Sequence, residues 1–227
     1  MSKRQTIPFS TVLASTVHDM KNALSLIMRS LDDVTDMLAA VDPDNQKVSL
    51  LQYETSRVNG LLVQLLALYK AEQQQLPLNI NYYNVYDFLE EQSLAHDELL
   101  KSKNIEIIIE ADDDLEWAFD ESLLSIVVNN ILTNNIRYTQ SLIRLTASVI
   151  NKMLVLNISD DGEGYPEIML EQQNDVILGI NQSTGSTGLG LYFAGQVASM
   201  HKSGSIKGNI YLSNGENSGS IFTIRIP

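Results

Sequence analysis

The chain has 227 residues, 44% of them hydrophobic, no cysteine and a formal net charge of −13. It is long enough to bury a core, and the lack of cysteine excludes disulfides, thiolate metal sites and cysteine nucleophiles. The excess of acidic residues repels nucleic acid and anionic lipid, so we expect nucleotide and protein, and no nucleic acid, as ligands.

The N-terminal segment begins with basic residues but lacks a continuous apolar stretch. No run elsewhere in the chain approaches the roughly 18 apolar residues that a membrane helix needs. The sequence therefore predicts a cytoplasmic protein without a membrane span.

Two amphipathic patterns fill the first 75 residues. Apolar residues recur at intervals of four and three over residues 13–38, and a second series covers residues 48–69, after a proline-containing break at 41–46. We expect two helices that form a hairpin. Two helices leave half of each apolar stripe in water, so the pattern favours a homodimer whose helices close a four-helix bundle.

The periodicity changes at the polar segment QQQLPLN, residues 73–79, where we place a domain boundary. This gives a helical domain, residues 1–75, and a second domain, residues 76–227. Helices on one face of a mostly antiparallel sheet, an α+β fold, are expected in the second domain. Its expected strands are 77–83, 104–110, 115–119, 142–150, 153–159, 203–213 and 218–227, and its expected helices are Asn84 to about Lys103, 121–139 and a last one from near Gly188.

The segment STVHDMKNAL, residues 15–24, places three polar groups in one helical turn. His18 follows the core position Val17, and Asn22, four residues later, lies on the same helix face. A neutral imidazole is a competent nucleophile near pH 7, and Asp19 is placed to hold the other ring N–H. From these residues alone, a solvated polar turn is the simpler interpretation.

Two glycine-containing segments predict close approach of the backbone to a ligand. In SDDGEGYP, Asp160 can accept a hydrogen bond from an amine, and Gly162 and Gly164 permit a tight turn. In GSTGLGLYF, a glycine-rich loop runs into a helix whose free N–H groups can bind an anion. Ordinary turns and flexible loops also contain such patterns.

The segment NNILTNNIRYT, residues 129–139, carries four asparagines in a helix, although asparagine is a poor residue for helix interiors. Asn130 and Asn134 share one face, where amide oxygens can face a hydrated Mg²⁺, and Arg137 one turn later can reach a phosphate. The alternative is a polar outer face.

The order of these four segments resembles the sensor histidine kinase family, from about residue 9 to residue 227. HDMKN is similar to the family's H-box, NNILTNNIRYT to its N-box, DDGEG to its G1 box and TGLGL to its G2 box, and GSIFTIRIP is similar to its closing strand. The resemblance implies a dimerisation and histidine phosphotransfer hairpin, followed by an α/β sandwich that binds ATP and Mg²⁺, of the Bergerat type.

The resemblance also implies roles for single residues. His18 would be the phosphoacceptor, Asp19 its acid/base partner, and Asn22 would position water for dephosphorylation of the partner. For the nucleotide, the resemblance implies Asn134 as the Mg²⁺ ligand, Asn130 beside it and Arg137 as a phosphate contact. Asp160, with Gly162 and Gly164, would bind the adenine amine. The G2 residues Thr187, Gly188, Leu189 and Gly190 would bind the phosphates, and residues 166–187 would form a mobile lid.

The implied activity is ATP-dependent phosphorylation of His18, transfer to an aspartate of a response regulator receiver domain, and dephosphorylation of that regulator. A phosphotransfer or adaptor module without ATP chemistry, or an ATP-driven clamp, are the alternatives. Because 17 residues precede His18, we expect the input signal from a separate sensory protein or from a part outside this sequence.

The sequence departs from the family pattern at three places. Ala23 replaces a common proline, Asn135 stands where a small residue is usual, and the lid is short. The two other histidines, His96 and His201, are expected to be structural, His96 on the surface.

Overall fold

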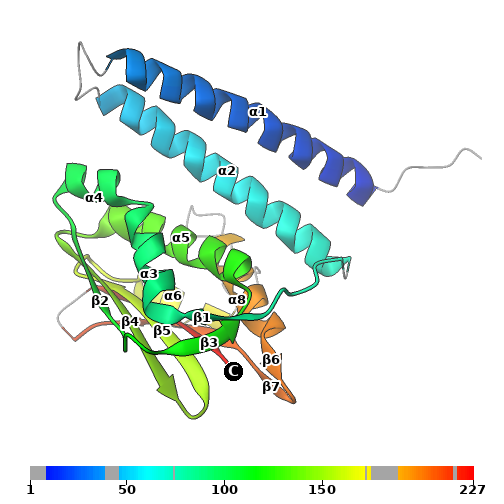
Figure 1. Ribbon diagram of the computed structural model, residues 1–227, viewed down its shortest axis with the longest axis vertical. Coiled ribbons are helices and arrows are strands. Elements are labelled where there is room, and N and C mark those ends of the chain that lie inside the picture. The colour runs from blue at the N-terminus through cyan, green and yellow to red at the C-terminus, as the bar shows by residue number, and fades with distance from the viewer. Residues whose placement is uncertain (1–8, 39–45, 74, 172, 175–188, 217–218) are drawn as a thin grey trace, which may run out of the picture. The chain divides into compact units, whose positions relative to one another are not determined.

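The computed structural model describes residues 9–38, 46–73, 75–171, 173–174, 189–216 and 219–227. The chain divides into two compact units, Met1–Pro77 and Leu78–Pro227 (Figure 1). Within the described residues, no helix combines the length and the apolar character needed to cross a membrane.

The first unit contains the two predicted helices, α1 (Phe9–Leu38) and α2 (Gln46–Glu72), which pack side by side (Figure 1). Helix α1 is continuous through Ala23. The break predicted at 41–46 lies, apart from Gln46, outside the described residues. Of the predicted stripe, Val17 and Leu62 are buried, whereas other members keep 36–54% of their surface exposed: Met20, Ile27, Val34, Leu51 and Val58.

The second unit is built on a five-stranded sheet with the strand order β2-β4-β5-β9-β8. Strand β2 runs parallel to β4 and the other neighbours are antiparallel, which confirms the mostly antiparallel sheet. The strands are β2 (Glu106–Glu110), β4 (Leu142–Ile150), β5 (Met153–Asp160), β8 (Asn209–Asn214) and β9 (Ser220–Ile226).

The predicted hairpin of β4 and β5 is confirmed. Ile150 pairs with Met153, and the two residues between them, Asn151 and Lys152, have φ of 53° and 64°. Two consecutive positive φ angles are typical of the tight turns whose twist matches antiparallel strands. Asparagine tolerates this backbone conformation better than most residues, which explains why the local sequence predicted the turn.

Helices α3 (Val85–Leu94), α5 (Glu121–Tyr138) and α8 (Leu189–Met200) contact strands of the sheet and lie on one side of it (Figure 1). Between the layers, four residues lie opposite one another on neighbouring strands and are each at most 1% exposed: Leu145, Ile158, Phe222 and Leu212. The helices add buried side chains such as Phe88, Leu124, Val128 and Phe193. This closed core holds the α+β layer together.

The helix predicted from Asn84 to Lys103 is wrong in one respect. Asn84 does cap α3, because its side chain accepts a hydrogen bond from the N–H of Asp87 at 2.9 Å. The helix ends at Leu94, however, and a separate helix, α4 (Asp97–Lys103), follows. The chain leaves helical geometry at His96, whose Nε2 lies 2.9 Å from Oδ1 of Asn129 on α5. His96 is therefore half-buried and not on the surface as expected.

Small elements complete the second unit. Strands β1 (Asn81–Asn84) and β3 (Glu116–Phe119) pair with each other outside the main sheet. The closing hairpin begins at Asn209 and not at 203, because β6 (Lys202–Ser203) and β7 (Ile206–Lys207) form a hairpin of their own around Gly204, which has φ of 61°. A short helix, α6 (Glu167–Glu171), follows the turn after β5.

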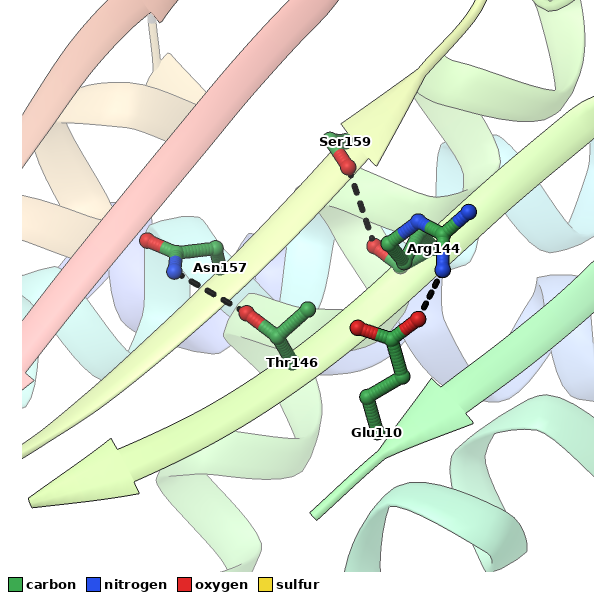
Figure 2. A network of polar contacts seen from close by, with 5 residues as sticks. All are labelled: Glu110, Arg144, Thr146, Asn157 and Ser159. Atoms are coloured by element: carbon green, nitrogen blue, oxygen red, sulfur yellow. Dashed lines mark hydrogen bonds and ion pairs between the residues drawn. The ribbon is translucent and has the colours of Figure 1, made fainter.

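The sheet face opposite the helices carries a network of polar contacts (Figure 2). Arg144 on β4 forms an ion pair with Glu110 on β2. On the neighbouring strand, Nδ2 of Asn157 donates to Oγ1 of Thr146 at 3.0 Å, and the hydroxyl of Ser159 donates to the carbonyl of Arg144 at 3.4 Å. These residues alternate with the buried ones along each strand, so the period of two in the sequence matches the two faces.

Candidate functional site

Helix α5 carries the asparagine-rich segment and begins at a buried cap. The carboxylate of Asp120 accepts a hydrogen bond from the N–H of Leu123 at 3.0 Å. Along the helix, Asn130 is half-buried, whereas Asn134 and Arg137 are exposed. Their spacing of four and three residues places these three side chains on one face, beside the apolar stripe that packs on the sheet.

Asn130 lies against the start of α8. A Cβ atom added at Gly190 would lie 2.3 Å from Nδ2 of Asn130, so only glycine fits without displacing the asparagine. Leu189, the first residue of α8, is half-buried. The structure thus brings the middle of the asparagine-rich helix and the described end of the glycine-rich segment together. Thr187 and Gly188 lie outside the described residues, as does most of the segment interpreted as a lid.

Asp160 lies at the end of β5 and is held by three donors. Its Oδ1 accepts from the N–H of Gly162 at 2.8 Å and from the N–H of Ser220 at 3.2 Å, and its Oδ2 accepts from the hydroxyl of Ser220. Gly219, just before Ser220, has φ of +91° and a Cβ there would lie 2.0 Å from the carbonyl oxygen of Asp160. A fixed carboxylate with further lone pairs remains an acceptor for a ligand amine.

The two glycines after Asp160 have distinct roles. At Gly162, a Cβ would lie 2.4 Å from the carbonyl oxygen of Tyr138, so this glycine lets the turn pack under the last turn of α5. Gly164 has φ of +82°, which disfavours other residues. Next to it, the side-chain amide of Asn214 accepts from the N–H of Tyr165 at 2.7 Å and donates to its carbonyl at 2.9 Å.

The neighbouring carboxylate, Asp161, anchors the loop between α5 and β4. Burial acts to raise the pKa of Asp161, but hydrogen bonds from the hydroxyl of Ser141 and from the backbone N–H groups of Ser141, Leu142 and Gln140 outweigh it and lower the pKa to about 2. Asp161 is therefore ionised at neutral pH and fixes the loop between α5 and β4, whereas the carboxylate of Asp160 is held by Gly162 and Ser220.

Tyr165 adds a neutral phenol to this region. Burial and the nearby charge of Asp160 raise the pKa of Tyr165 to about 12, against a hydrogen bond with Ser220 that lowers it. The phenol consequently keeps its proton at neutral pH.

The proposed phosphoacceptor turn belongs to the first unit. His18, Asp19 and Asn22 all lie in α1, and Asp19 and Asn22 are exposed. The side chain of His18 lies outside the described part of the chain. The interpretation of this turn as the site of phosphorylation therefore rests on the sequence of α1.

Sequence reasoning missed Ser220 and Asn214, which bind Asp160 and the backbone of Tyr165. Both lie in the closing hairpin, and the pairing of Ser159 with Ile221 places Ser220 beside Asp160. The signal in the sequence is the glycine before the last strand and the serine that begins it, but this signal is useful only once the order of strands in the sheet is known.

Comparison with known proteins gives consistent results. Residues 119–227 match the family described as histidine kinase-, DNA gyrase B-, and HSP90-like ATPase. The sensor histidine kinase WalK of Bacillus subtilis is 25% identical over 95% of this chain and 36% of its own length. The sensor histidine kinase RppB of Synechocystis sp. is 22% identical over 94% of this chain and 48% of its own length. The chain thus spans less than half of either relative.

Among solved structures, the histidine kinase AdeS of Acinetobacter baumannii superposes with a TM-score of 0.62 at 22% identity, covering 92% of this chain and 96% of that one. This likeness extends over both units of the chain and supports the α+β fold derived above.

Proposed function

Because residues 119–227 form a histidine kinase-type ATPase domain and the chain belongs to the histidine kinase family, we propose that it is an ATP-dependent protein histidine kinase. It phosphorylates its own His18 and passes the phosphoryl group to an aspartate of a response regulator receiver domain. Because ATP is its substrate, the cytoplasm is the expected compartment. The observation that carries the proposal is the contact of Asn130 with Gly190, which joins the asparagine-rich helix to the glycine-rich segment.

The residues around Asp160 fit an adenine nucleotide. The carboxylate is held by Gly162 and Ser220 and can accept from the exocyclic amine of adenine. Gly162 has no side chain between the turn and α5, and Gly164 holds a backbone conformation that few other residues adopt. The two glycines let the turn after Asp160 pack against Tyr138 and Asn214, and a carboxylate in so fixed a position supports a base-binding role.

Asn134 and Arg137 are proposed to serve the phosphate end. Among the described residues, no cluster of three His, Asp or Glu could hold a metal ion. Mg²⁺ does not require one, because it commonly keeps waters and takes one or two protein oxygens together with substrate phosphates. The amide oxygen of Asn134 would hold it, Asn130 lies beside it, and Thr187, Gly188, Leu189 and Gly190 are proposed to bind the phosphates. Bound Mg²⁺ supplies charge neutralisation on the transferred phosphoryl group.

In the first unit, His18 acts as the nucleophile. Asp19 holds a ring proton of the imidazole and stabilises its positive charge as the bond to the γ-phosphorus of ATP forms, while the bond from that phosphorus to the bridging oxygen breaks and ADP leaves. Asn22, one turn later on the same face, orients a water for in-line attack on the phosphoaspartate of the docked regulator. The chain therefore also dephosphorylates its regulator.

We further propose that the chain works as a homodimer through the first unit. The apolar residues Met20, Ile27, Val34, Leu51 and Val58 stay exposed in a single chain although they lie on the predicted stripe. A second copy of the hairpin would cover them in a four-helix bundle. The input signal is proposed to come from a separate sensory protein or from sequence outside this chain.

The test is incubation of the full chain with γ-labelled ATP and Mg²⁺, followed by acid and alkali treatment. Label that is lost in acid and kept in alkali identifies phosphohistidine, and His18→Ala should abolish it without weakening ATP binding. Undiminished label in this variant would place the acceptor elsewhere, and an adaptor without ATP chemistry would take up no label. A clamp would hydrolyse ATP without becoming labelled.

A further inference from the structure

One buried polar group in the second unit has no partner. Asn135 is 4% exposed and belongs to the face of α5 whose other buried members are all apolar. Its Nδ2 makes no hydrogen bond, and it is the one such buried side-chain atom in the described part of this unit. Native proteins rarely keep a buried amide unpaired, because the group loses its hydrogen bonds to water without replacement.

Asn129, another asparagine of the same helix, makes the hydrogen bonds that Asn135 lacks. Asn129 has both ends of its amide paired, with Nδ2 donating to Oε1 of Gln92 at 2.7 Å and Oδ1 at 2.9 Å from Nε2 of His96. The second unit therefore supplies hydrogen-bond partners for the side-chain amide of Asn129, which comes from the same helix. The unpaired amide of Asn135 needs another explanation.

The position of Asn135 points to the base site. It begins the last turn of α5, and the carbonyl of Tyr138 in this turn packs on Gly162, two residues after Asp160. Helix α5 contacts β5, at whose end Asp160 lies. The unpaired donor thus lies in the part of the helix that packs against the turn carrying the proposed acceptor of the adenine amine.

We propose that Asn135 is a specificity residue of the nucleotide site, whose Nδ2 donates a hydrogen bond to a ring nitrogen of adenine flanking the amine. Adenine presents a donor, its amine, beside ring nitrogens that only accept. A carboxylate and an amide N–H complement this pattern, because one accepts and the other donates. The proposal rests on the proposed function and adds a recognition group to it.

The test measures binding and not phosphorylation. The full chain is titrated by calorimetry with ADP and with its 1-deaza and 7-deaza analogues, in each of which CH replaces one flanking ring nitrogen. Wild type should bind the analogue that lacks the accepted nitrogen about tenfold more weakly than ADP, because the buried donor then stays unpaired. In Asn135→Leu, which has the same branched shape, this preference should disappear.

Two further variants separate recognition from folding. Asn135→Ala removes the amide without added bulk and should lose the same preference. It replaces Asn135→Leu in the titration if the leucine variant folds poorly. Asn129→Leu, the matched control, should lower stability but keep the preference for ADP. Without ligand, Asn135→Leu should unfold at a higher denaturant concentration than wild type, because an unpaired buried amide has been removed.

An equal ratio of ADP to analogue affinities in wild type and both Asn135 variants would overturn the proposal, as would equal binding of all three ligands by wild type. If wild type binds ADP and one of these two results is found, the role of Asn135 is refuted but the proposed kinase function is not. Failure of wild type to bind ADP at all would contradict the proposed function itself.

Discussion

The two units of the chain differ in how completely each buries its apolar residues. In the second unit, Phe222 and Leu145 are fully buried between sheet and helices. In the first unit, Met20 and Ile27 each keep 48% of their surface exposed although they lie on an amphipathic stripe. A sheet covered by helices closes a core within one chain, whereas two helices alone leave part of their apolar stripes exposed, and the proposed homodimer would cover these stripes.

The largest expected effect comes from opening the closed core. Phe222→Ala should lower the free energy of unfolding of the second unit by about 3–5 kcal/mol, because it removes a fully buried ring and leaves a cavity. The only tryptophan, Trp117, lies in β3 of this unit, so its fluorescence in a denaturant titration reports the change. Ile150→Ala, at the exposed end of β4, should cost less than about 1 kcal/mol, and equal losses would contradict the closed core.

The second effect tests the open stripe. Ile27→Asp should weaken the proposed homodimer by tenfold or more, because a charge would enter the interface. Light scattering across a concentration series measures the dissociation. Leu26→Asp is the matched control, since Leu26 is 65% exposed but lies off the stripe. A wild-type chain that stays monomeric at micromolar concentration, or two variants that dissociate equally, would refute dimerisation through this stripe.

A smaller effect is expected at the start of α5. Asp120→Ala should destabilise the second unit by about 2 kcal/mol, because the helix loses its cap and the N–H of Asn79, 2.7 Å from Oδ2, loses its acceptor. Asp120→Asn keeps one acceptor oxygen and should cost less. The fluorescence of Trp117 again reports unfolding, and a loss in the asparagine variant as large as in the alanine variant would show that the charge, not the cap, matters.

The smallest effect is a pH dependence from His201. This buried ring accepts from the N–H of Asp120 at Nε2 and donates from Nδ1 to the carbonyl of Val197, at 3.0 and 2.8 Å. Burial lowers the pKa of His201, opposed by the hydrogen bond with Val197 and the charge of Asp120. The unfolded chain then binds more protons below pH of about 6.5, so stability should fall as the pH drops through this value towards the lowered folded pKa.

Unfolding measured between pH 5 and 8 should show this slope in wild type. A His201→Gln variant should show a shallower one, and the residual slope is expected from His96, whose pKa burial also lowers, opposed by the hydrogen bond that its ring makes to Oδ1 of Asn129. An identical slope in wild type and variant would mean that His201 does not titrate differently on folding.

Local sequence was sufficient wherever neighbours along the chain decide the structure. The turn at Asn151 and Lys152 and the cap at Asn84 depend on the backbone preferences of a few consecutive residues. The periods of two and near 3.6 likewise predicted the strands and the long helices, since they express which side of an element is buried. The sequence also determined which residues are candidates for the site, because residue types and their spacing in the four motifs are local features.

Tertiary structure alone decided how those candidates meet. The helix break at His96 follows from a partner on α5, the support of Asp160 by Ser220 from the pairing of β5 with β9, and the contact of Asn130 with Gly190 from the packing of α8 on α5. The sequence could not predict the unpaired amide of Asn135, because burial and hydrogen-bond partners depend on how the helices pack on the sheet. Each of these features joins residues far apart in the chain, and no local preference encodes the order in which strands and helices come together.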